Sequence, residues 1–332
     1  MRKGTLAVEL TGLRHWDFPL AALVAYGVLR ILEEELGKEA TLRFKRSPSG
    51  PIPVLHGLDE KDLLETLANY LDSLEVDEMK ICAEATHIKD LSEGYFRLLE
   101  EACGQGDRRP AAFLQAYLAP NRRDKNMPTL TLFDTTKGQQ RFFKVLDGAY
   151  EIAKQIGFQE GLQRVLFGEG ALTYPGEEVP RFLQLGWHES QYREWADRAR
   201  NPSTEGDRYR VRLHPVAVLL AWEALPFYPM VLGPGLNPRP IGFLVPEGRG
   251  GSPSLVLPLP RHPVGAGELR ALIATGPAAI AIGQGWPRDV ELWVSPLRGS
   301  KGEKGAYPTF MGARPWAART ASGGRIPGRS AQ

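Results

Sequence analysis

The sequence has little cysteine and no long hydrophobic run, and each shortage excludes a class of protein. Its 332 residues contain only two cysteines, Cys82 and Cys103, which are too few and too far apart for a CxxC metal site or a disulfide framework. No window approaches the roughly 18 consecutive apolar residues of a membrane span, and the start, MRKGTLAVEL, lacks the apolar region of a signal peptide. We therefore expect a cytoplasmic protein that does not enter a membrane.

The motifs of common catalytic and cofactor sites are missing as well. The six histidines include no HxxxH or HExxH pair, and the chain has no GxSxG, GxxxxGK[ST] or GxGxxG loop. We expect no catalytic residue, no metal and no cofactor. Catalytic residues that meet only in the fold would escape this search, so a nuclease with metal-binding carboxylates such as Asp134 and Glu223 stays open as an alternative.

Apolar periodicity predicts an α+β fold that opens with a strand, a helix and two strands. Strand composition marks residues 4–13, 39–46 and 51–57. Between the first two, apolar residues recur at i, i+3, i+4 and i+7 and mark the buried face of a helix with Pro19 near its first turn. The residues of this face are Leu20, Leu23, Val24, Gly27, Val28, Ile31 and Leu32.

A helical middle and a mixed region rich in proline and glycine follow. The middle has predicted helices at 58–74, 89–103, 109–120 and about 138–156, and a strand at 129–134; the stripe of Leu63, Leu64, Leu67 and Leu71 is typical of a helix with a solvated acidic face. Beyond residue 170 we predict helices at 190–200 and 214–225 and strands at 240–246, 254–260 and 289–296. The predicted organisation is an N-terminal α+β domain (1–170), a C-terminal α+β domain (171–297) and a partly disordered basic tail rich in Gly and Arg (298–332).

The net charge of +2 conceals a strong segregation along the chain. Residues 58–101 contain 13 acidic and 4 basic side chains, residues 107–144 contain 8 basic and 3 acidic, and residues 298–332 contain 7 basic and 1 acidic. The two basic segments favour an electrostatic footprint for a polyanion, and solvated surface arginines are the plain alternative. Arginines of the tail would add nonspecific affinity: Arg314, Arg319, Arg325 and Arg329.

The stretch DTTKGQQRFFK, residues 134–144, combines the start of a predicted helix with polar and basic side chains. Asp134 or a following threonine is expected to cap the helix, while Phe142, Val145, Leu146 and Ala149 pack inward. The first exposed turn of a helix also has free backbone amides that can meet a phosphate. We predict contacts to a nucleic-acid backbone here and just upstream, from Arg108, Arg109, Arg122, Arg123, Lys125, Lys137, Gln139, Gln140 and Arg141.

Seven tryptophans could stack on bases, but the sequence does not give the exposure of their side chains, so we interpret them as core or interface residues. Trp222 lies within an otherwise apolar helix and is expected to be buried. The set is Trp16, Trp187, Trp195, Trp222, Trp286, Trp293 and Trp316.

Three stretches resemble the CRISPR-associated large-subunit-like proteins of subtype I-G, formerly I-U. LTGLRHWDFPLAALVAYGVLRIL (10–32) is similar to their amino-terminal signature, LFDTTKGQQRFF (132–143) to a Gly-Gln-Gln-x-Phe-Phe element, and HPVAVLLAWEALPFYPM (214–230) to a Trp-Leu-Ala-Phe-Glu-Gly-Leu-like helix followed by Phe-Pro. The three occur in the same order. Departures are Tyr26, where a small residue is common, Ala224, where glycine is common, and a tail without the heptads of a helical bundle.

The resemblance implies a non-catalytic subunit of a type I CRISPR surveillance complex (Cascade) in antiviral defence. Its expected ligands are CRISPR RNA and target DNA, either the flanking-motif (PAM) duplex or the displaced strand, and cleavage would belong to a helicase-nuclease recruited later. The expected protein partners are the RNA-backbone subunit and the RNA-end-binding subunit. Besides the nuclease, a purely protein-binding accessory subunit remains an alternative.

Overall fold

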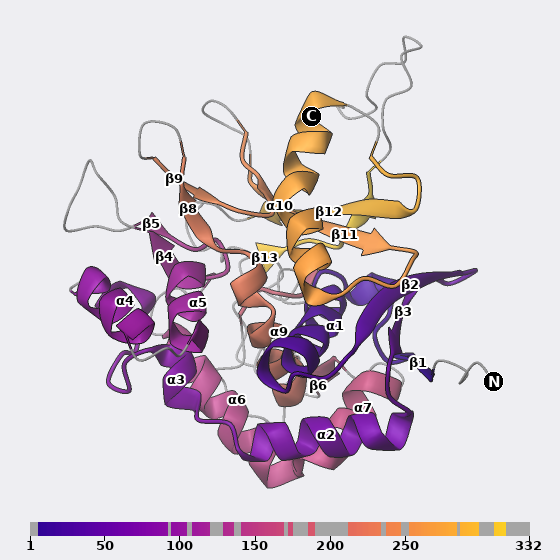
Figure 1. Ribbon diagram of the computed structural model, residues 1–332, viewed down its shortest axis with the longest axis horizontal. Helices are drawn as coiled ribbons and strands as arrows, with labels where there is room; N and C mark the ends of the chain where they lie inside the picture. Colours follow the sequence, from indigo (N-terminus) through magenta and orange to yellow (C-terminus); the bar gives the residue numbers. More distant parts are fainter. Residues whose placement is uncertain are drawn as a thin grey trace, which may run out of the picture.

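Helices and antiparallel strands alternate along the chain, which makes the fold α+β as predicted (Figure 1). The computed structural model describes residues 6–91, 94–104, 108–119, 129–135, 141–168, 172–174, 185–189, 212–233, 237–246, 252–283, 286–298 and 309–316. None of the described helices combines the length and the apolar character needed to cross a membrane.

The N-terminal segment forms a three-stranded antiparallel sheet beside one helix. Strand β1 (Ala7–Glu9), helix α1 (Leu20–Arg30), β2 (Thr41–Ser47) and β3 (Gly50–His56) follow in the expected order, and β3 lies between β1 and β2. In β2 the buried residues Leu42 and Phe44 alternate with less buried neighbours, so one face of the sheet turns to the core.

Helix α1 crosses α9 (Pro215–Glu223) in the centre of the molecule (Figure 1). Every residue of both helices is buried, because both sequences are apolar all round instead of on one stripe. The crossing is close at Gly27, where an added Cβ would lie 1.7 Å from the backbone oxygen of Leu220. After Arg30 the helical path continues through one wider turn, Ile31–Glu35.

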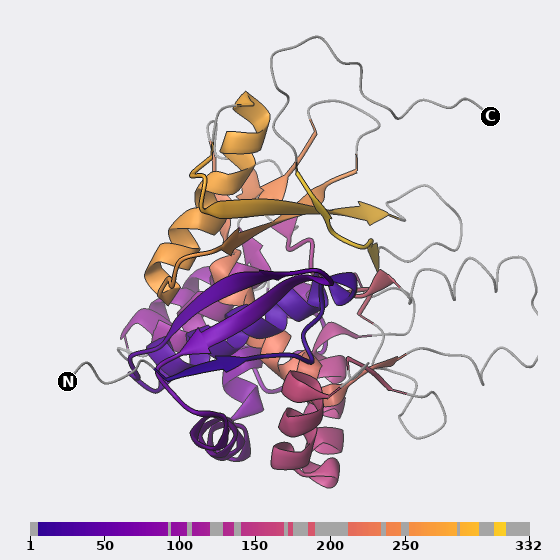
Figure 2. The same cartoon turned by 90° about the vertical axis from the view of Figure 1, so that its right-hand side faces the viewer.

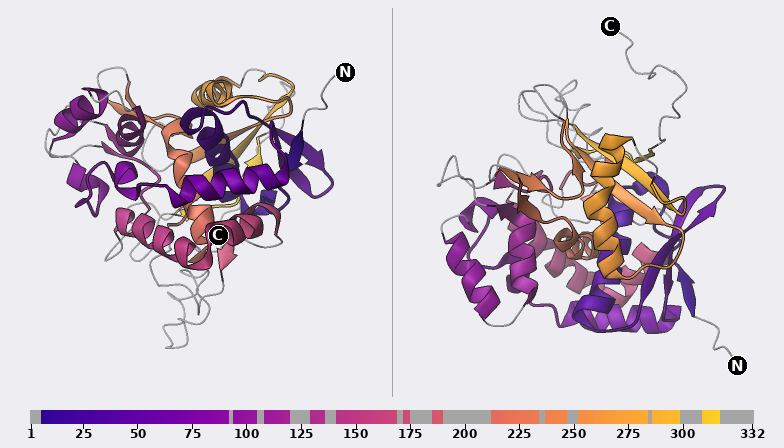
Figure 3. Two further views of the ribbon diagram at one scale, coloured as in Figure 1. Left: turned by 60° about the horizontal axis from the view of Figure 1, so that its bottom comes forward. Right: turned by 45° about the horizontal axis from the view of Figure 1, so that its top comes forward.

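Three helices cover the underside of this centre, where α2 (Glu60–Asp72) lies against α7 (Phe158–Phe167), and α6 (Phe142–Ile156) packs on α9 (Figure 3). Asp59 caps α2 by accepting a hydrogen bond from the Asp62 amide at 2.8 Å. The predicted leucine stripe of α2 is buried.

Short elements fill one flank of the molecule. Helix α5 (Arg108–Tyr117) packs against α3 (Val76–Lys80) and α4 (Tyr95–Gly104), and the chain then forms a small hairpin of β4 (Leu118–Ala119) and β5 (Thr129–Leu130). The acidic α2–α3 region therefore lies beside the first basic segment.

The C-terminal region forms a second antiparallel sheet with the path β10-β11-β12-β13, and β14 also pairs with β12. Helix α10 (Ala266–Ile282) packs on β11, and Figure 2 shows the gold strands of this sheet next to the indigo strands of the N-terminal sheet. The strands are β10 (Phe243–Leu244), β11 (Ser254–Pro260), β12 (Val290–Arg298), β13 (Thr309–Phe310) and β14 (Arg314–Pro315). Two further two-stranded pairs are β6 (Thr173–Tyr174) with β7 (Arg212–Leu213), and β8 (Met230–Leu232) with β9 (Pro238–Pro240).

Part of the predicted basic tail belongs to this sheet. Strands β13 and β14 pair with β12, and Phe310 is fully buried, so residues 309–316 of the predicted tail form part of this sheet. A single hydrophobic cluster takes side chains from both sides of the predicted boundary at residue 170. The boundary residues themselves, and the helix predicted at 190–200, lie outside the described residues.

Candidate nucleic-acid interface

The structure describes three of the nine predicted contact residues. Arg108 is exposed at the first residue of α5, and Arg141 is exposed immediately before α6. Arg109 lies in the interior with 8% of its surface exposed. The other six lie outside the described residues: Arg122, Arg123, Lys125, Lys137, Gln139 and Gln140.

Arg108 lies at the start of α5, whereas Arg141 precedes α6, whose first residue lies near the end of α5. The ring of Tyr117, the last residue of α5, is 5.9 Å from the ring of Phe142, the first residue of α6. Tyr117 is nine residue steps after Arg108, a rise of about 14 Å along a helix. Arg141 adjoins Phe142, so the two exposed arginines would contact phosphates at separate points of a ligand.

The position of Arg109 corrects its predicted role as a nucleic-acid contact. Its guanidinium donates to Glu223 Oε1 at 2.8 Å and forms ion pairs with Glu35 at 2.9 Å and Glu78 at 3.5 Å. With its charge balanced and its side chain buried, Arg109 has no face left for a phosphate. Glu78, which belongs to the acidic segment 58–101, therefore neutralises part of the basic segment together with Glu35 and Glu223.

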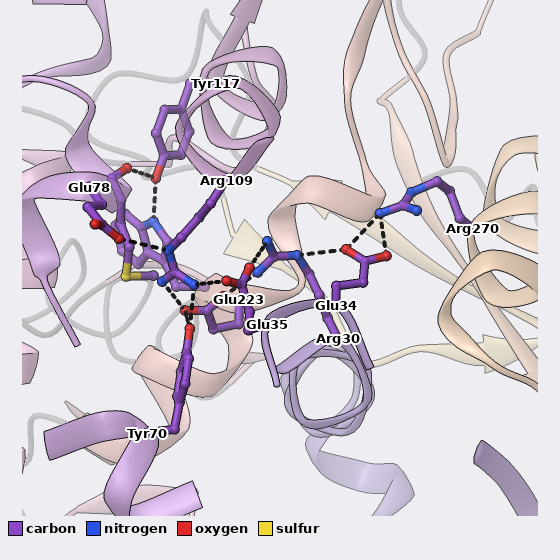
Figure 4. Close-up of polar contacts among 11 residues, drawn as sticks. Arg30, Glu34, Glu35, Tyr70, Glu78, Arg109, Tyr117, Glu223 and Arg270 are labelled. Atoms are coloured by element: carbon purple, nitrogen blue, oxygen red, sulfur yellow. Dashed lines mark hydrogen bonds and ion pairs between the residues drawn. The ribbon is translucent and has the colours of Figure 1, made fainter. Parts of the chain in front are cut away.

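Glu223 is the centre of this buried charge network (Figure 4). Its side chain is 0% exposed, and its two carboxylate oxygens lie between two arginines: Arg30 donates to Oε2 and Arg109 to Oε1. The Tyr70 hydroxyl donates to Oε1 at 2.8 Å. Pairing of this kind is what a carboxylate needs in an apolar interior.

Two features let the two arginines lie close together in spite of their like charge. Both guanidinium groups lie over the ring of Phe113, at 5.2 Å for Arg30 and 5.4 Å for Arg109. Glu35 also bridges them, with one oxygen on each guanidinium. Burial, and then the neighbouring Glu223 charge, raise the pKa of Tyr70 far above its usual value, so its hydroxyl keeps the proton that it donates.

The network bears on the nuclease alternative. Both oxygens of Glu223 are occupied by arginine and tyrosine donors, which leaves this carboxylate no position for a cation. Across the described parts of the chain, no three His, Cys, Asp or Glu side chains are grouped so that they could hold a metal ion.

The start of α6 differs from the prediction. The helix begins at Phe142, after the predicted start near residue 138, and Arg141 occupies the N-cap position without a capping hydrogen bond from its side chain. The inward packing of Phe142, Val145, Leu146 and Ala149 is confirmed.

The three stretches that carry the family resemblance meet in the core. The first and third touch through Gly27 and Leu220, and their charged residues Arg30 and Glu223 pair. The second joins them where the ring of Phe142 lies 4.4 Å from the ring of Trp222, which is fully buried as expected. Segments about 200 residues apart in the sequence therefore form one packing unit.

Comparison with known families, with curated proteins and with solved structures gives no match for this chain.

Substitution of Gly27 by alanine tests this packing unit. The new Cβ would overlap the Leu220 carbonyl, so α1 and α9 must separate, and we expect a loss of about 1–3 kcal/mol in unfolding free energy measured in urea. Gly267→Ala is the matched control, since Gly267 is exposed in α10 with open space around it and should leave stability unchanged or slightly raised. Equal effects of the two changes would contradict the close crossing.

Proposed function

We propose that this protein is a non-catalytic, nucleic-acid-binding subunit of a type I CRISPR surveillance complex. The observation that carries the proposal is the meeting of Gly27, Arg30, Phe142, Trp222 and Glu223, all from the three family-like stretches, in one packing unit. The contact between these stretches supports the proposal that the chain has the scaffold of that family.

The proposed ligands follow from the charge distribution and from the family resemblance. Arg108 and Arg141 present two exposed guanidinium groups on the first basic segment. A subunit that grips backbone while base pairing with CRISPR RNA reads the sequence needs cationic side chains and no bond-breaking groups. Target DNA, as the flanking-motif duplex or the displaced strand, is the proposed ligand, and the RNA-holding subunits are the proposed docking partners.

The decisive experiment is co-expression of the full chain with a CRISPR RNA and the RNA-backbone and RNA-end-binding subunits of its locus. We expect a stable ribonucleoprotein that contains this chain and binds target DNA. Absence of the chain from an otherwise assembled complex would overturn the proposal. Cleavage of DNA by the purified chain with a divalent metal, abolished by Asp134→Ala, would establish the nuclease alternative instead.

Charge reversal tests the contacts within the assembled complex. We expect the double variant Arg108→Glu, Arg141→Glu to bind target duplex more weakly and to lower the slope of log affinity against log salt by about 2, since roughly 0.9 is lost for each phosphate contact. Lys61→Glu on the acidic helix α2 is the matched control for charge. An unchanged slope would show that these arginines meet no phosphate, and would favour a protein-binding role for this face.

A further inference from the structure

Two adjacent hollows lie on either side of strand β14. The first, of about 680 Å³, is bounded by the β2–β3 turn and by residues around β12, and the second, of about 760 Å³, by residues 15–16 and the far end of β12. Pro315 and Trp316 line both, so the two form one continuous surface with Trp316 in the middle. The backbone amide of Trp316 donates to Leu292 at 2.7 Å and holds it at the sheet.

Tryptophan side chains line this surface along its length. Trp286 and Trp316 line the first hollow, and Trp16 lines the second with 49% of its surface exposed. The guanidinium of Arg14 lies 5.1 Å from the Trp16 ring centre, and His15 meets the same ring edge-on. The buried indole nitrogen of Trp286 has no hydrogen-bond acceptor within the described part of the chain, so an acceptor from a ligand would satisfy it.

Some arginines at this surface are not paired with the acidic residues beside them, so they can contact an anionic ligand. Both acidic residues at the hollows are engaged: Glu291 accepts from Arg46 and Arg261, and Glu189 accepts from the Gly312 amide at 3.0 Å. Three arginines at the hollows are exposed and make no ion pair to any described residue: Arg288, Arg298 and Arg314.

We infer that these hollows bind single-stranded nucleic acid, with bases stacked on Trp16 and Trp316 and phosphates on Arg298 and Arg314. This inference rests on the proposed function, for which the displaced strand or an unpaired part of the CRISPR RNA is the ligand. Exposed aromatic faces beside unpaired cations are the pattern of single-strand binding surfaces. A duplex would not serve, because its bases already stack on one another and offer no face to a tryptophan.

Fluorescence anisotropy of the full chain with a labelled single strand of about 12 nucleotides tests the inference. We expect the single strand to bind more tightly than its duplex, and Trp16→Ala and Trp316→Ala each to weaken single-strand binding by roughly 5- to 150-fold. Phe96→Ala is the matched control, since Phe96 is 68% exposed on α4 and lies outside the hollows. Thermal unfolding of each variant identifies loss of binding that comes from loss of fold.

The arginines give a second readout that does not depend on the tryptophans. We expect Arg298→Glu, Arg314→Glu to lower the salt slope for single strand by about 1.4, at about 0.7 for each phosphate, whereas Arg239→Glu on β9 leaves it unchanged. Unchanged single-strand affinity in both folded tryptophan variants would overturn the inference. So would binding of an acidic proline-rich peptide at the hollows with no binding of the oligonucleotide.

Different experimental outcomes would overturn the proposed function and the proposed binding surface. If the chain assembles with its companion subunits and Trp16→Ala and Trp316→Ala bind single strand normally, the hollows are excluded and the proposed function stands. If the isolated chain binds single strand through the hollows but never joins a surveillance complex, the proposed function is overturned and the binding surface stands.

Discussion

Replacement of Glu223 by alanine is expected to lower the unfolding free energy by about 3–5 kcal/mol. The carboxylate is fully buried between Arg30 and Arg109, and its removal takes away one of the two counter-charges, Glu223 and Glu35, that these buried guanidinium groups share. The Tyr70 hydroxyl loses its acceptor in the same step. Urea titration followed by circular dichroism measures the change.

Glu78→Ala is the control for the Glu223 prediction. Glu78 contacts the same arginine at 3.5 Å, but its side chain is 41% exposed, so its pair is screened and we expect a loss below about 1 kcal/mol. Glu223→Gln keeps an oxygen for the Tyr70 hydroxyl while it removes the charge. Its loss of unfolding free energy should lie between those of Glu223→Ala and Glu78→Ala. A Glu223→Ala variant as stable as the Glu78→Ala variant would show that the arginines are neutralised elsewhere.

Acidification below pH 6.5 is expected to destabilise the protein through His214. Burial, and then the nearby Arg164, lower the pKa of His214 to about 3. Above the unfolded value of about 6.5 the imidazole is neutral in both states; below it the unfolded chain takes up a proton that the folded chain refuses until pH reaches about 3. Stability therefore falls by about 1.4 kcal/mol per pH unit in this window, or about 4–5 kcal/mol across it.

The variant His214→Asn isolates this contribution. The Nδ1 atom of His214 caps α9 by accepting from the Val216 amide at 3.3 Å, and asparagine supplies an N-cap acceptor without a titrating proton. Between pH 7 and pH 5 we expect the wild type to lose about 2 kcal/mol more than the variant in urea titrations. Parallel losses in the two proteins would place the acid sensitivity in other groups.

Elements with a clear local apolar pattern were predicted well. The leucine stripe and acidic first turn of residues 58–74 correspond to α2, and the apolar runs at 254–260 and 289–296 correspond to β11 and β12. In α2 the buried residues recur with the helical period, whereas β11 is a short apolar run buried along nearly its whole length, and in both cases local sequence contains the signal.

Elements that depend on distant neighbours were predicted less well. The periodicity of residues 20–32 indicated one buried face, whereas α1 is buried on every side. Helix α10 was not predicted, because it contains Pro277 and two glycines and has no strong apolar stripe. Helix α7 was also missed; its ten residues follow directly after the helix predicted at 138–156.

Prediction of the candidate site from the sequence was limited in the same way, because its contacts also depend on distant neighbours. Arg109 was grouped with Arg108 because the two are adjacent in a basic segment, but successive residues of a helix point in different directions, and α5 turns one arginine to solvent and the other to Glu223. A signal for the buried pair was present: Arg30 and Glu223 each lie in an otherwise apolar helix, where a charge needs a partner. The pattern does not say which partner.

By itself the sequence determined the α+β class, most of the amphipathic elements and the burial of Trp222, because these follow from the spacing of apolar residues over one or two turns. Only the tertiary structure decided that Glu223 neutralises two arginines and that Trp16 and Trp316 line one surface. Those contacts join residues 193, 114 and 300 positions apart. Pairings at such separations depend on how whole elements pack, and no local period encodes them.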